Sequence, residues 1–349
     1  MEKKRANDPK KPILSKRAKQ SITTKPIQIM NTENNIIHKE NITALRILVK
    51  SREDFQLQRT RMDNRLSRKA DGTPTDADER MIRIDDADMF ISISEATRAM
   101  EAEIEKKFAK VLKRFPIYTH WLKDVLGVGP SIAATIISGI DIEKATTVSK
   151  IWQYCGMNPD SVNGKKRVKT SKPKAYQPES GKVVKRAEDY VIVETTEKIR
   201  GDKLTPGFIS PYNKYMKKTL LGILSGSMIK AGLRWVEADE QQFSQTPDTY
   251  RKEVGNVKKV AHIKSRYVQF YMDYKHRLSH SSAITNHRQK GKVVQMAWKD
   301  VTPGHRDMAA KRYMVKMFLV DLYKQWRSIE GLPVRDPYQE QYLGHKHVA

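Results

Sequence analysis

Residues 126–134 read Leu-Gly-Val-Gly-Pro-Ser-Ile-Ala-Ala, a tight apolar turn with glycine at two positions. Apolar residues flank this turn at helical spacing and predict a short helix on each side: Ile117, Trp121, Leu122 and Val125 before it, and Ile132, Ala133, Ile136 and Ile137 after it. Because glycine has no Cβ, a ligand can approach the backbone closely there. The second helix begins at the same place, and the N–H groups of its first turn favour an anion.

This order of residues matches the helix-hairpin-helix pattern: an apolar residue, then Gly-apolar-Gly, then an apolar-Ala pair one turn later. Such a hairpin contacts phosphates of the nucleic-acid backbone and does not read the bases. We therefore expect phosphate contacts at Gly127, Val128, Gly129 and Ser131. The alternative is a turn that serves helix packing alone, and the pattern does not distinguish DNA from structured RNA.

The charge of the chain predicts the same kind of partner. Its 349 residues include 66 Lys and Arg against 40 Asp and Glu, for a formal net charge of +26. An excess of this size repels itself unless a polyanion neutralises it, and nucleic acid releases counterions at every phosphate that is neutralised. An unusually basic soluble protein is the alternative interpretation.

Cysteine content and hydropathy exclude several other classes. With Cys155 as its single cysteine, the chain has no internal disulfide and no zinc site made of thiolates. No apolar run approaches the roughly 18 residues of a membrane span, and no apolar segment of a secretory signal follows the basic N-terminus. We expect no membrane partner, no evident cofactor, and a location in the cytoplasm of a prokaryotic cell, associated with the nucleoid.

The first two of four expected segments cover residues 1–115. Residues 1–41 are basic without apolar periodicity, which predicts a disordered basic arm. Residues 42–115 carry two long apolar stripes joined by a turn-rich segment at 71–74, which predicts a long, coiled-coil-like helical hairpin that either packs on its own core or joins two copies of the chain. We expect a homo-oligomer through this hairpin. Its apolar positions are Leu45, Leu48, Phe55, Met62 and Leu66 in the first helix, and Ile93, Met100, Ile104, Phe108, Val111 and Phe115 in the second.

Residues 116–331 form the third expected segment, in which the helix-hairpin-helix is followed by a helical C-terminal domain. Helices are predicted near 212–231, 265–278 and 307–328, with one short strand at 190–194. A basic loop or hairpin occupies residues 160–186, and residues 332–349 form an irregular tail. The fold class we expect is therefore mainly α. Candidate phosphate contacts are Lys165, Lys166, Arg167, Lys169 and Lys172 in the basic loop, and Lys214, Lys217 and Lys218 on a later helix.

Several stretches resemble, in the same order, those of insertion-sequence transposases of the IS-one-ten and IS-one-sixteen family. After the hairpin, Val148–Pro159 reads as an apolar helix that ends in a Gly-x-x-Pro turn, and Pro211–Leu220 resembles the family's Gly-Asn-basic-x-Leu-basic helix. Phe270-Tyr271 and the segment Ala309–Trp326 resemble its later helices, and Leu45–Leu66 its coiled coil. The likeness spans residues 42–327 and corresponds to the C-terminal part of such a transposase.

The resemblance implies a catalytic apparatus that this sequence shows only in part. Family members carry an N-terminal RNase-H-like domain whose four acidic residues bind Mg²⁺; we do not find that domain here, so Mg²⁺ is expected only if a partner supplies one. Family members also use a serine of the C-terminal domain. The closest match is Ser161, followed by Ser180, and polar residues in a basic loop are the alternative interpretation.

Two other candidate sites follow from residue spacing. His276 and His280 stand one helical turn apart, as two metal ligands do, but the sequence shows no third ligand, and phosphate contact or simple exposure is favoured. A helix-hairpin-helix DNA glycosylase is an alternative enzyme, which needs an acid after the hairpin; Asp141 is the acid available there.

Taken together, the residues and the resemblance predict a DNA-binding, transposase-like protein that acts in DNA transposition or recombination. The alternative is a non-catalytic protein derived from such a transposase that binds DNA or structured RNA. Strand cleavage that requires Mg²⁺ distinguishes the two.

Overall fold

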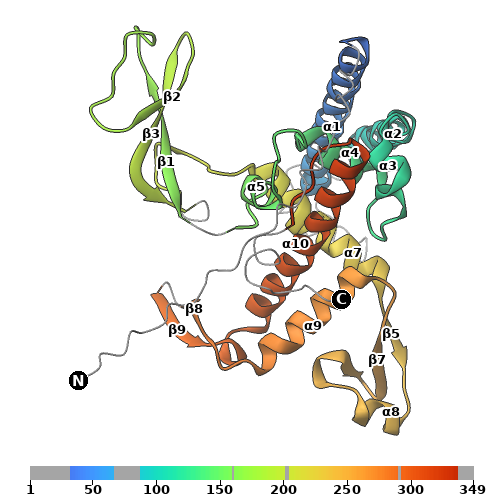
Figure 1. Cartoon of the computed structure of the whole chain (residues 1–349). Helices are drawn as coiled ribbons and strands as arrows, with labels where there is room; N and C mark the ends of the chain where they lie inside the picture. Colours follow the sequence, from blue (N-terminus) through green and yellow to red (C-terminus); the bar gives the residue numbers. More distant parts are fainter. Residues whose placement is uncertain (1–31, 67–86, 159–160, 201–203, 290–291, 337–349) are drawn as a thin grey trace, which may run out of the picture. The chain divides into compact units, whose positions relative to one another are not determined.

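The computed structural model describes residues 32–66, 87–158, 161–200, 204–289 and 292–336 (Figure 1). Most of the predicted basic arm, the turn at 71–74 and the end of the predicted tail therefore lie outside the described residues. No helix within the described ranges has both the length and the apolar character needed to cross a membrane.

The described part of the chain is mainly helical. The helices are α1 (Thr32–Leu66), α2 (Ala87–Leu112), α3 (Pro116–His120), α4 (Pro130–Gly139), α5 (Val148–Tyr154), α6 (Lys214–Lys217), α7 (Ser225–Gly232), α8 (Glu240–Gln245), α9 (Arg266–His280) and α10 (Pro303–Ile329). Shorter elements are the 3-10 turns η3 (Leu122–Asp124), η5 (Asp248–Tyr250) and η6 (Trp298–Asp300), and the π-helical η4 (Lys218–Leu224), which joins α6 to α7.

Three antiparallel sheets accompany the helices in the described residues. The first has the order β2-β3-β1-β4, from β1 (Val162–Lys169), β2 (Lys182–Arg186), β3 (Tyr190–Ile199) and β4 (Phe208–Ile209). The second has the order β5-β7-β6, from β5 (Leu233–Glu237), β6 (Arg251–Val254) and β7 (Val257–Ile263). The third is the pair β8 (Ile284–Gln289) and β9 (Lys292–Ala297).

Helices α1 and α2 run antiparallel. Arg52 bonds Glu105 at 3.1 Å, Arg59 bonds Glu101 at 2.8 Å, and the hydroxyl of Ser94 donates to Asp63 at 2.7 Å. The residue numbers of the partners on α2 fall as the residue numbers on α1 rise. Two packed helices show this order only when they run in opposite directions.

The buried side of α2 differs from the predicted stripe in its N-terminal half. Ile104 and Phe108 are buried as expected, but Ile93 is 42% and Met100 51% exposed, so that part of the prediction is wrong. The buried positions there are Ser94 and Thr97. The apolar pattern predicted the wrong buried side because Ser94 and Thr97 can be buried despite their polar hydroxyl groups. Each hydroxyl makes a hydrogen bond: that of Ser94 to Asp63, and that of Thr97 to the carbonyl of Ile93 at 2.8 Å.

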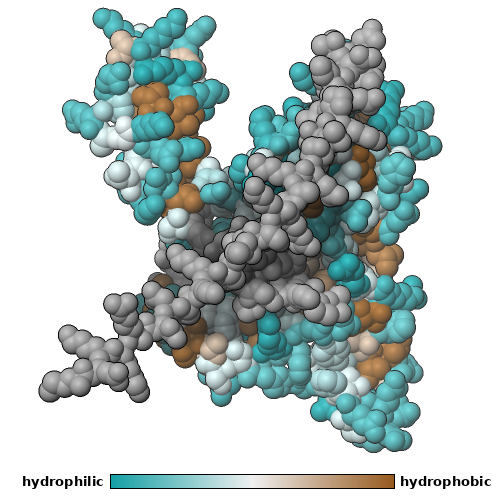
Figure 2. Space-filling model, viewed as in Figure 1, coloured by the Kyte–Doolittle hydropathy of each residue, from teal (hydrophilic) through white to brown (hydrophobic). Residues whose placement is uncertain are grey.

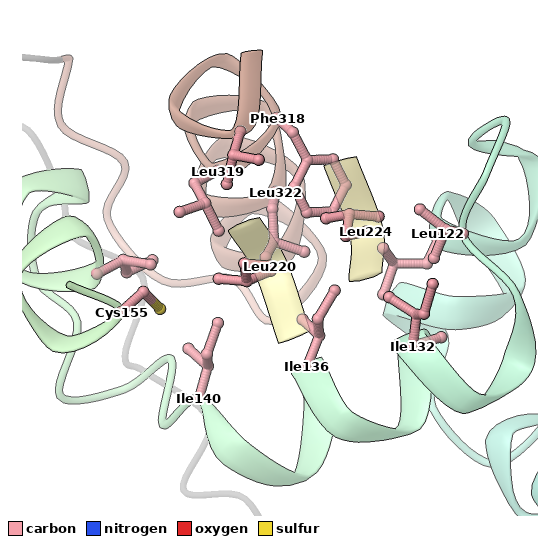
Figure 3. Close-up of a cluster of buried hydrophobic side chains, with 14 of the residues drawn as sticks. Leu122, Ile132, Ile136, Ile140, Cys155, Leu220, Leu224, Phe318, Leu319 and Leu322 are labelled. Carbon is pink, nitrogen blue, oxygen red and sulfur yellow. The ribbon is translucent and has the colours of Figure 1, made fainter. Parts of the chain in front are cut away.

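Helix α4 lies at the centre of the core. Its Ile132 and Ile136 point toward Phe318 and Leu322 of α10, with Leu220 of η4 between them (Figure 3). Burial of each such side chain contributes about 1.5–3 kcal/mol. Because seven of the ten residues of α4 are buried, the hairpin that precedes it is held in place by packing.

A buried arginine and a buried cysteine complete this core. Arg327 of α10 donates to the carbonyls of Ile142 and Ala145 at 2.8 and 3.1 Å, which ties α10 to the segment after α4. Burial raises the pKa of Cys155 to about 12, so this thiol stays protonated and is not a nucleophile.

About half of the basic segment 160–186, expected as a loop or hairpin, consists of strands. Val162–Lys169 and Lys182–Arg186 are strands of the first sheet, and only residues 170–181 connect them. Alternating lysines and valines make strands with one polar and one apolar face, and so few apolar residues give a weak signal in sequence. The strand expected at 190–194 is confirmed and extends to Ile199.

Candidate nucleic-acid interface

The hairpin residues occupy a turn between η3 and α4. Gly127 has a φ of +89°, a conformation that favours glycine. A Cβ built at Gly127 would lie 2.5 Å from the Cα of Met228 and 2.6 Å from its nitrogen, because α7 packs directly against the turn. The amide of Val128 donates to the carbonyl of Val125 at 3.0 Å. Gly127 thus has a structural reason to be glycine that involves no ligand.

Gly129 differs from Gly127 in its surroundings. It caps the N-terminus of α4 with an ordinary φ of −77°, and a Cβ built there meets nothing within 4 Å. Pro130 follows at the first helical position, where a missing N–H costs nothing. The amides of the first turn of a helix lack carbonyl partners within the helix, so those of Gly129 and Ser131 are the ones placed to meet an anion.

One face of the first sheet gathers the basic residues of β1. Strand pairing sets Lys165 opposite Glu194, Arg167 opposite Ile192 and Lys169 opposite Tyr190. Since directly paired residues of antiparallel strands point to the same side, all of these side chains share one face. The guanidinium of Arg167 lies 4.3 Å from the centre of the Tyr190 ring, which agrees with this placement.

Strand β2 and the end of β3 add cations to the same face. Lys182 pairs with Glu194, Lys185 with Ile192, and Lys198 with Asn163. We call this surface the basic face; its cations are Lys165, Arg167, Lys169, Lys182, Lys185 and Lys198, and Glu194 is the one acid that the register of β1–β3 places among them.

The opposite face of this sheet is apolar. Val191 and Val193 are buried there, and Phe208 of β4 stacks over Gly164, where a Cβ would come within 2.2 Å of its ring. Hydrophobic and hydrophilic residues lie side by side on this sheet in Figure 2. Arg186 holds the connection 170–181 to the sheet by donating to the carbonyls of Pro173, Lys174 and Tyr176.

Two predicted contacts in the basic segment lie away from the basic face. Lys166 points to the apolar side, 4.2 Å from the ring of Phe208 and 3.5 Å from a carboxylate oxygen of Glu197. Lys172 lies in the connection 170–181 and lines a shallow pocket with Arg186. The structure therefore separates these two from Lys165, Arg167 and Lys169.

The predicted lysines of the later helix lie on α6 and at the start of η4. Asn213 caps α6 by accepting from the amide of Met216 at 3.1 Å, and its side chain donates to the hydroxyl of Tyr154 at 2.8 Å. Lys214 and Lys218 are exposed, whereas the amine of Lys217 lies 4.6 Å from the centre of the Tyr212 ring.

Ser161, the first serine candidate, lines a pocket of about 460 Å³ at one end of the basic face. Lys165, Lys198 and Glu194 line the same pocket, together with residues of α5 and of the segment around β4. The amine of Lys198 donates to the side-chain oxygen of Asn163 at 2.7 Å, and the amide of Asn163 donates to Glu194 at 3.3 Å. The pocket thus brings Ser161 together with two lysines and one glutamate.

Ser180, the second candidate, is exposed in the connection just before β2 and does not line this pocket. Asp141, the acid required by the glycosylase alternative, bonds the amine of Lys144 at 2.6 Å and its backbone amide at 3.2 Å. Both contacts belong to the turn after α4.

Sequence reasoning did not include Lys182, Lys185 and Lys198 among the candidates. Their grouping depends on strand register, which brings residues 182–185 beside 165–169 through β3. Cations alternate in the sequence with apolar residues such as Val168, Val183 and Val191. Such alternation is typical of a sheet with one polar and one apolar face, and it could have indicated the grouping.

Comparison of the chain with protein-family models, with curated proteins and with solved structures finds no match.

Proposed function

We propose that the chain binds nucleic acid, with DNA as its first candidate, through the basic face of the β1–β3 sheet. The observation that supports this most is the gathering of six cations with one acid on a single exposed face. Successive residues on one face of a strand are about 6.8 Å apart, which equals two phosphate intervals of about 3.4 Å along the axis of one DNA strand. Lys165, Arg167 and Lys169 therefore form a row of cations whose spacing is of the same order as that between phosphates.

The proposed biological role is transposition or recombination of DNA. It rests on the resemblance to insertion-sequence transposases, with Mg²⁺ chemistry entering only through an acidic domain supplied by a partner. In this role the basic face and the hairpin at Gly129 hold the backbone, and neither reads the bases. Phosphate binding at the hairpin stays a prediction.

The test compares two triple substitutions of equal charge. The variant K165Q/R167Q/K169Q removes three cations from the basic face, whereas K106Q/K107Q/K110Q removes three exposed cations from α2. Binding to duplex DNA, branched DNA and structured RNA is measured across a salt series. Each lost phosphate contact lowers the slope of log affinity against log salt by about 0.9, so the first variant loses up to about 2.7 of slope and the control loses none.

Equal losses in both variants would show that binding follows net charge alone and would contradict the basic face as the site. The preferred ligand among the three identifies the nucleic acid. Circular dichroism of both variants checks that the sheet and the helices are retained.

Strand cleavage at Ser161 is the second candidate function. The supporting observation is the pocket that Ser161 shares with Lys165 and Lys198, because a nucleophilic serine on phosphate needs neighbouring groups that activate it or stabilise charge. In a cleavage assay with Mg²⁺, Ser161→Ala should abolish cleavage and retain binding, with Ser180→Ala as the matched control. Cleavage that survives Ser161→Ala rejects this role, and Mg²⁺-dependent cleavage by the wild-type protein argues against the non-catalytic alternative.

A further inference from the structure

A cluster of metal-ligating side chains lies outside the proposed interface, on α9 and η5. His276 and His280 are one turn apart on α9, and Asp248 of η5 lies against both. The Nδ1 atom of His276 is 3.4 Å from one carboxylate oxygen of Asp248, and the Nε2 atom of His280 is 3.5 Å from the other. One atom from each residue thus lies within 4.8 Å of the other two.

These separations match the edges of a small coordination shell. Zinc binds imidazole nitrogen at about 2.0–2.1 Å and carboxylate oxygen at about 2.0–2.2 Å in tetrahedral geometry, which puts neighbouring ligand atoms about 3.3–3.5 Å apart. Both measured histidine–aspartate distances are of this size, but they run to the two different oxygens of Asp248, so binding through one oxygen needs a turn of that carboxylate. Two imidazoles and one carboxylate suit a borderline ion such as zinc, whereas Mg²⁺ and Ca²⁺ prefer oxygen ligands throughout.

One ring nitrogen of His280 faces a carbonyl oxygen and the other faces Asp248. Its Nδ1 atom lies 3.0 Å from the carbonyl oxygen of His276, and this contact is a hydrogen bond only when Nδ1 carries the proton. In a neutral imidazole with its proton on Nδ1, the lone pair of Nε2 is free to bind a metal ion and faces a carboxylate oxygen of Asp248 at 3.5 Å. Donation of the second ring N–H to a carbonyl is also the usual outer-shell contact of a zinc-bound histidine.

Contacts outside the cluster hold the two elements together. The hydroxyl of Tyr250 donates to the carboxylate of Asp273 on α9, and the Tyr250 ring packs edge-on against His276 with the ring centres 6.0 Å apart. The hydroxyl of Thr249 lies 2.7 Å from Nδ1 of His276 and must move aside for an ion at this nitrogen. Apart from that shift and a turn of the Asp248 carboxylate, the ligand atoms already lie within 4.8 Å of one another.

We propose that Asp248, His276 and His280 bind one zinc ion, with the remaining coordination position open to water. The ion ties η5, and with it the β5–β7 sheet, to the C-terminal turn of α9. This site is separate from the nucleic-acid interface, and its test does not depend on nucleic-acid binding.

The experiment measures zinc binding to the full chain stripped with a chelator. His345 and His347 near the C-terminus are changed to Gln in every protein compared, so that this histidine pair does not add its own binding. On that background we expect one Zn²⁺ per chain by elemental analysis and a higher melting temperature with zinc. Co²⁺ in place of zinc should give the visible absorption of a low-coordinate site.

Three further substitutions locate the ion. His280→Gln and Asp248→Asn should each weaken zinc affinity at least about tenfold, since loss of an outer-shell contact alone costs about 10–100-fold. His262→Gln removes an exposed histidine of β7 and should leave affinity unchanged. Circular dichroism without metal shows whether each variant folds.

Equal zinc affinity in the His280→Gln, Asp248→Asn and His262→Gln proteins would overturn the site. So would absence of any zinc-dependent rise in melting temperature in the parent protein, which would leave a salt bridge between Asp248 and protonated histidines as the role of the cluster. Nucleic-acid binding measured in excess chelator reports on the basic face alone, so failure of either proposal is seen independently.

Discussion

A side chain at Gly127 and one at Gly129 would meet very different surroundings. Gly127 has a left-handed backbone conformation, and a side chain there would collide with the backbone of α7. A side chain at Gly129 would enter open space. Substitution at Gly127 therefore tests packing, and substitution at Gly129 tests ligand binding. The difference decides which glycine is informative about the hairpin.

Gly127→Ala should destabilise the protein. The strained backbone alone costs about 1–3 kcal/mol, and the contact of a Cβ with Met228 adds to this cost. Urea unfolding of the variant and of Gly129→Ala, its control, measures the difference. Equal midpoints for the two variants would contradict the close approach of α7.

Gly129→Asp should keep the fold and lose phosphate binding at the hairpin. Aspartate is a favoured N-cap residue, and a negative charge at a helix N-terminus contributes about 0.3–1 kcal/mol. The same carboxylate would stand where a phosphate is predicted, so we expect affinity for DNA to fall at least tenfold while the melting temperature holds.

The control for that change is Gly129→Asn, which caps the helix similarly without the charge. If the Asp and Asn variants bind DNA equally well, the hairpin is a packing turn and the basic face is the main site.

Among the elements, α9 and α10 are joined by one partly buried carboxylate in addition to their aromatic contacts. Asp307 of α10 accepts a hydrogen bond from the hydroxyl of Tyr271 and lies 2.8 Å from the amine of Lys311 and 3.8 Å from that of Lys275. Burial alone would raise the pKa of Asp307, but its hydrogen bonds with Lys311 and Tyr271 and the charges of Lys311 and Lys275 bring it below the usual 3.8. A lowered pKa in the folded state means that the carboxylate stabilises the fold above about pH 4 and stops doing so as the pH falls through the folded-state pKa.

Asp307→Asn should therefore lower stability at pH 7 by about 1–2 kcal/mol and lower it progressively less below pH 4. Urea unfolding of both proteins between pH 7 and pH 3 measures this convergence. Asp336→Asn, which removes an exposed carboxylate 3.1 Å from the amine of Lys324, should change stability little at any pH. A constant difference between Asp307→Asn and wild type across the series would show that the charge of Asp307 has no part in it.

For the whole molecule, self-association through the α1–α2 pair stays a prediction. Met89, Ile93 and Met100 are exposed along α2, at spacings that place them on one side of the helix. The variant I93E/M100E should convert an oligomer to a monomer without loss of helicity, because neither side chain is buried within the chain. Light scattering after size exclusion gives the mass; a monomeric wild type, or an oligomer that survives both changes, would contradict the prediction.

The long helices were predictable because each repeats its apolar residues over several turns. Met314, Phe318, Leu322 and Trp326 of α10 stand at helical spacing, and all four are buried. A signal repeated this often predicts the helix even when some positions do not fit. Helix α2 was predicted correctly although Ile93, assigned to its buried side, is exposed.

The short strands left no comparable signal. Strand β5 has five residues and β6 has four, too few for alternation to exceed chance, and most of their side chains are exposed. Strand β6 pairs with β7 through a local turn, whereas β5 exists because a distant partner completes its hydrogen bonds, as Val260 of β7 pairs with Val236. Pairing of this kind is a property of the folded chain.

The candidate sites divide in the same way. Glycine spacing, net charge and the spacing of His276 and His280 are local, and they predicted a hairpin turn, a basic segment and a histidine pair for which phosphate contact or exposure was favoured over metal binding. The six-cation face and the addition of Asp248 required strand register and helix packing, because they join residues far apart in the chain. Local patterns can be read from the sequence because the order of neighbouring residues along the chain is fixed by covalent bonds. Contacts between distant residues form only when burial of the core brings their elements together.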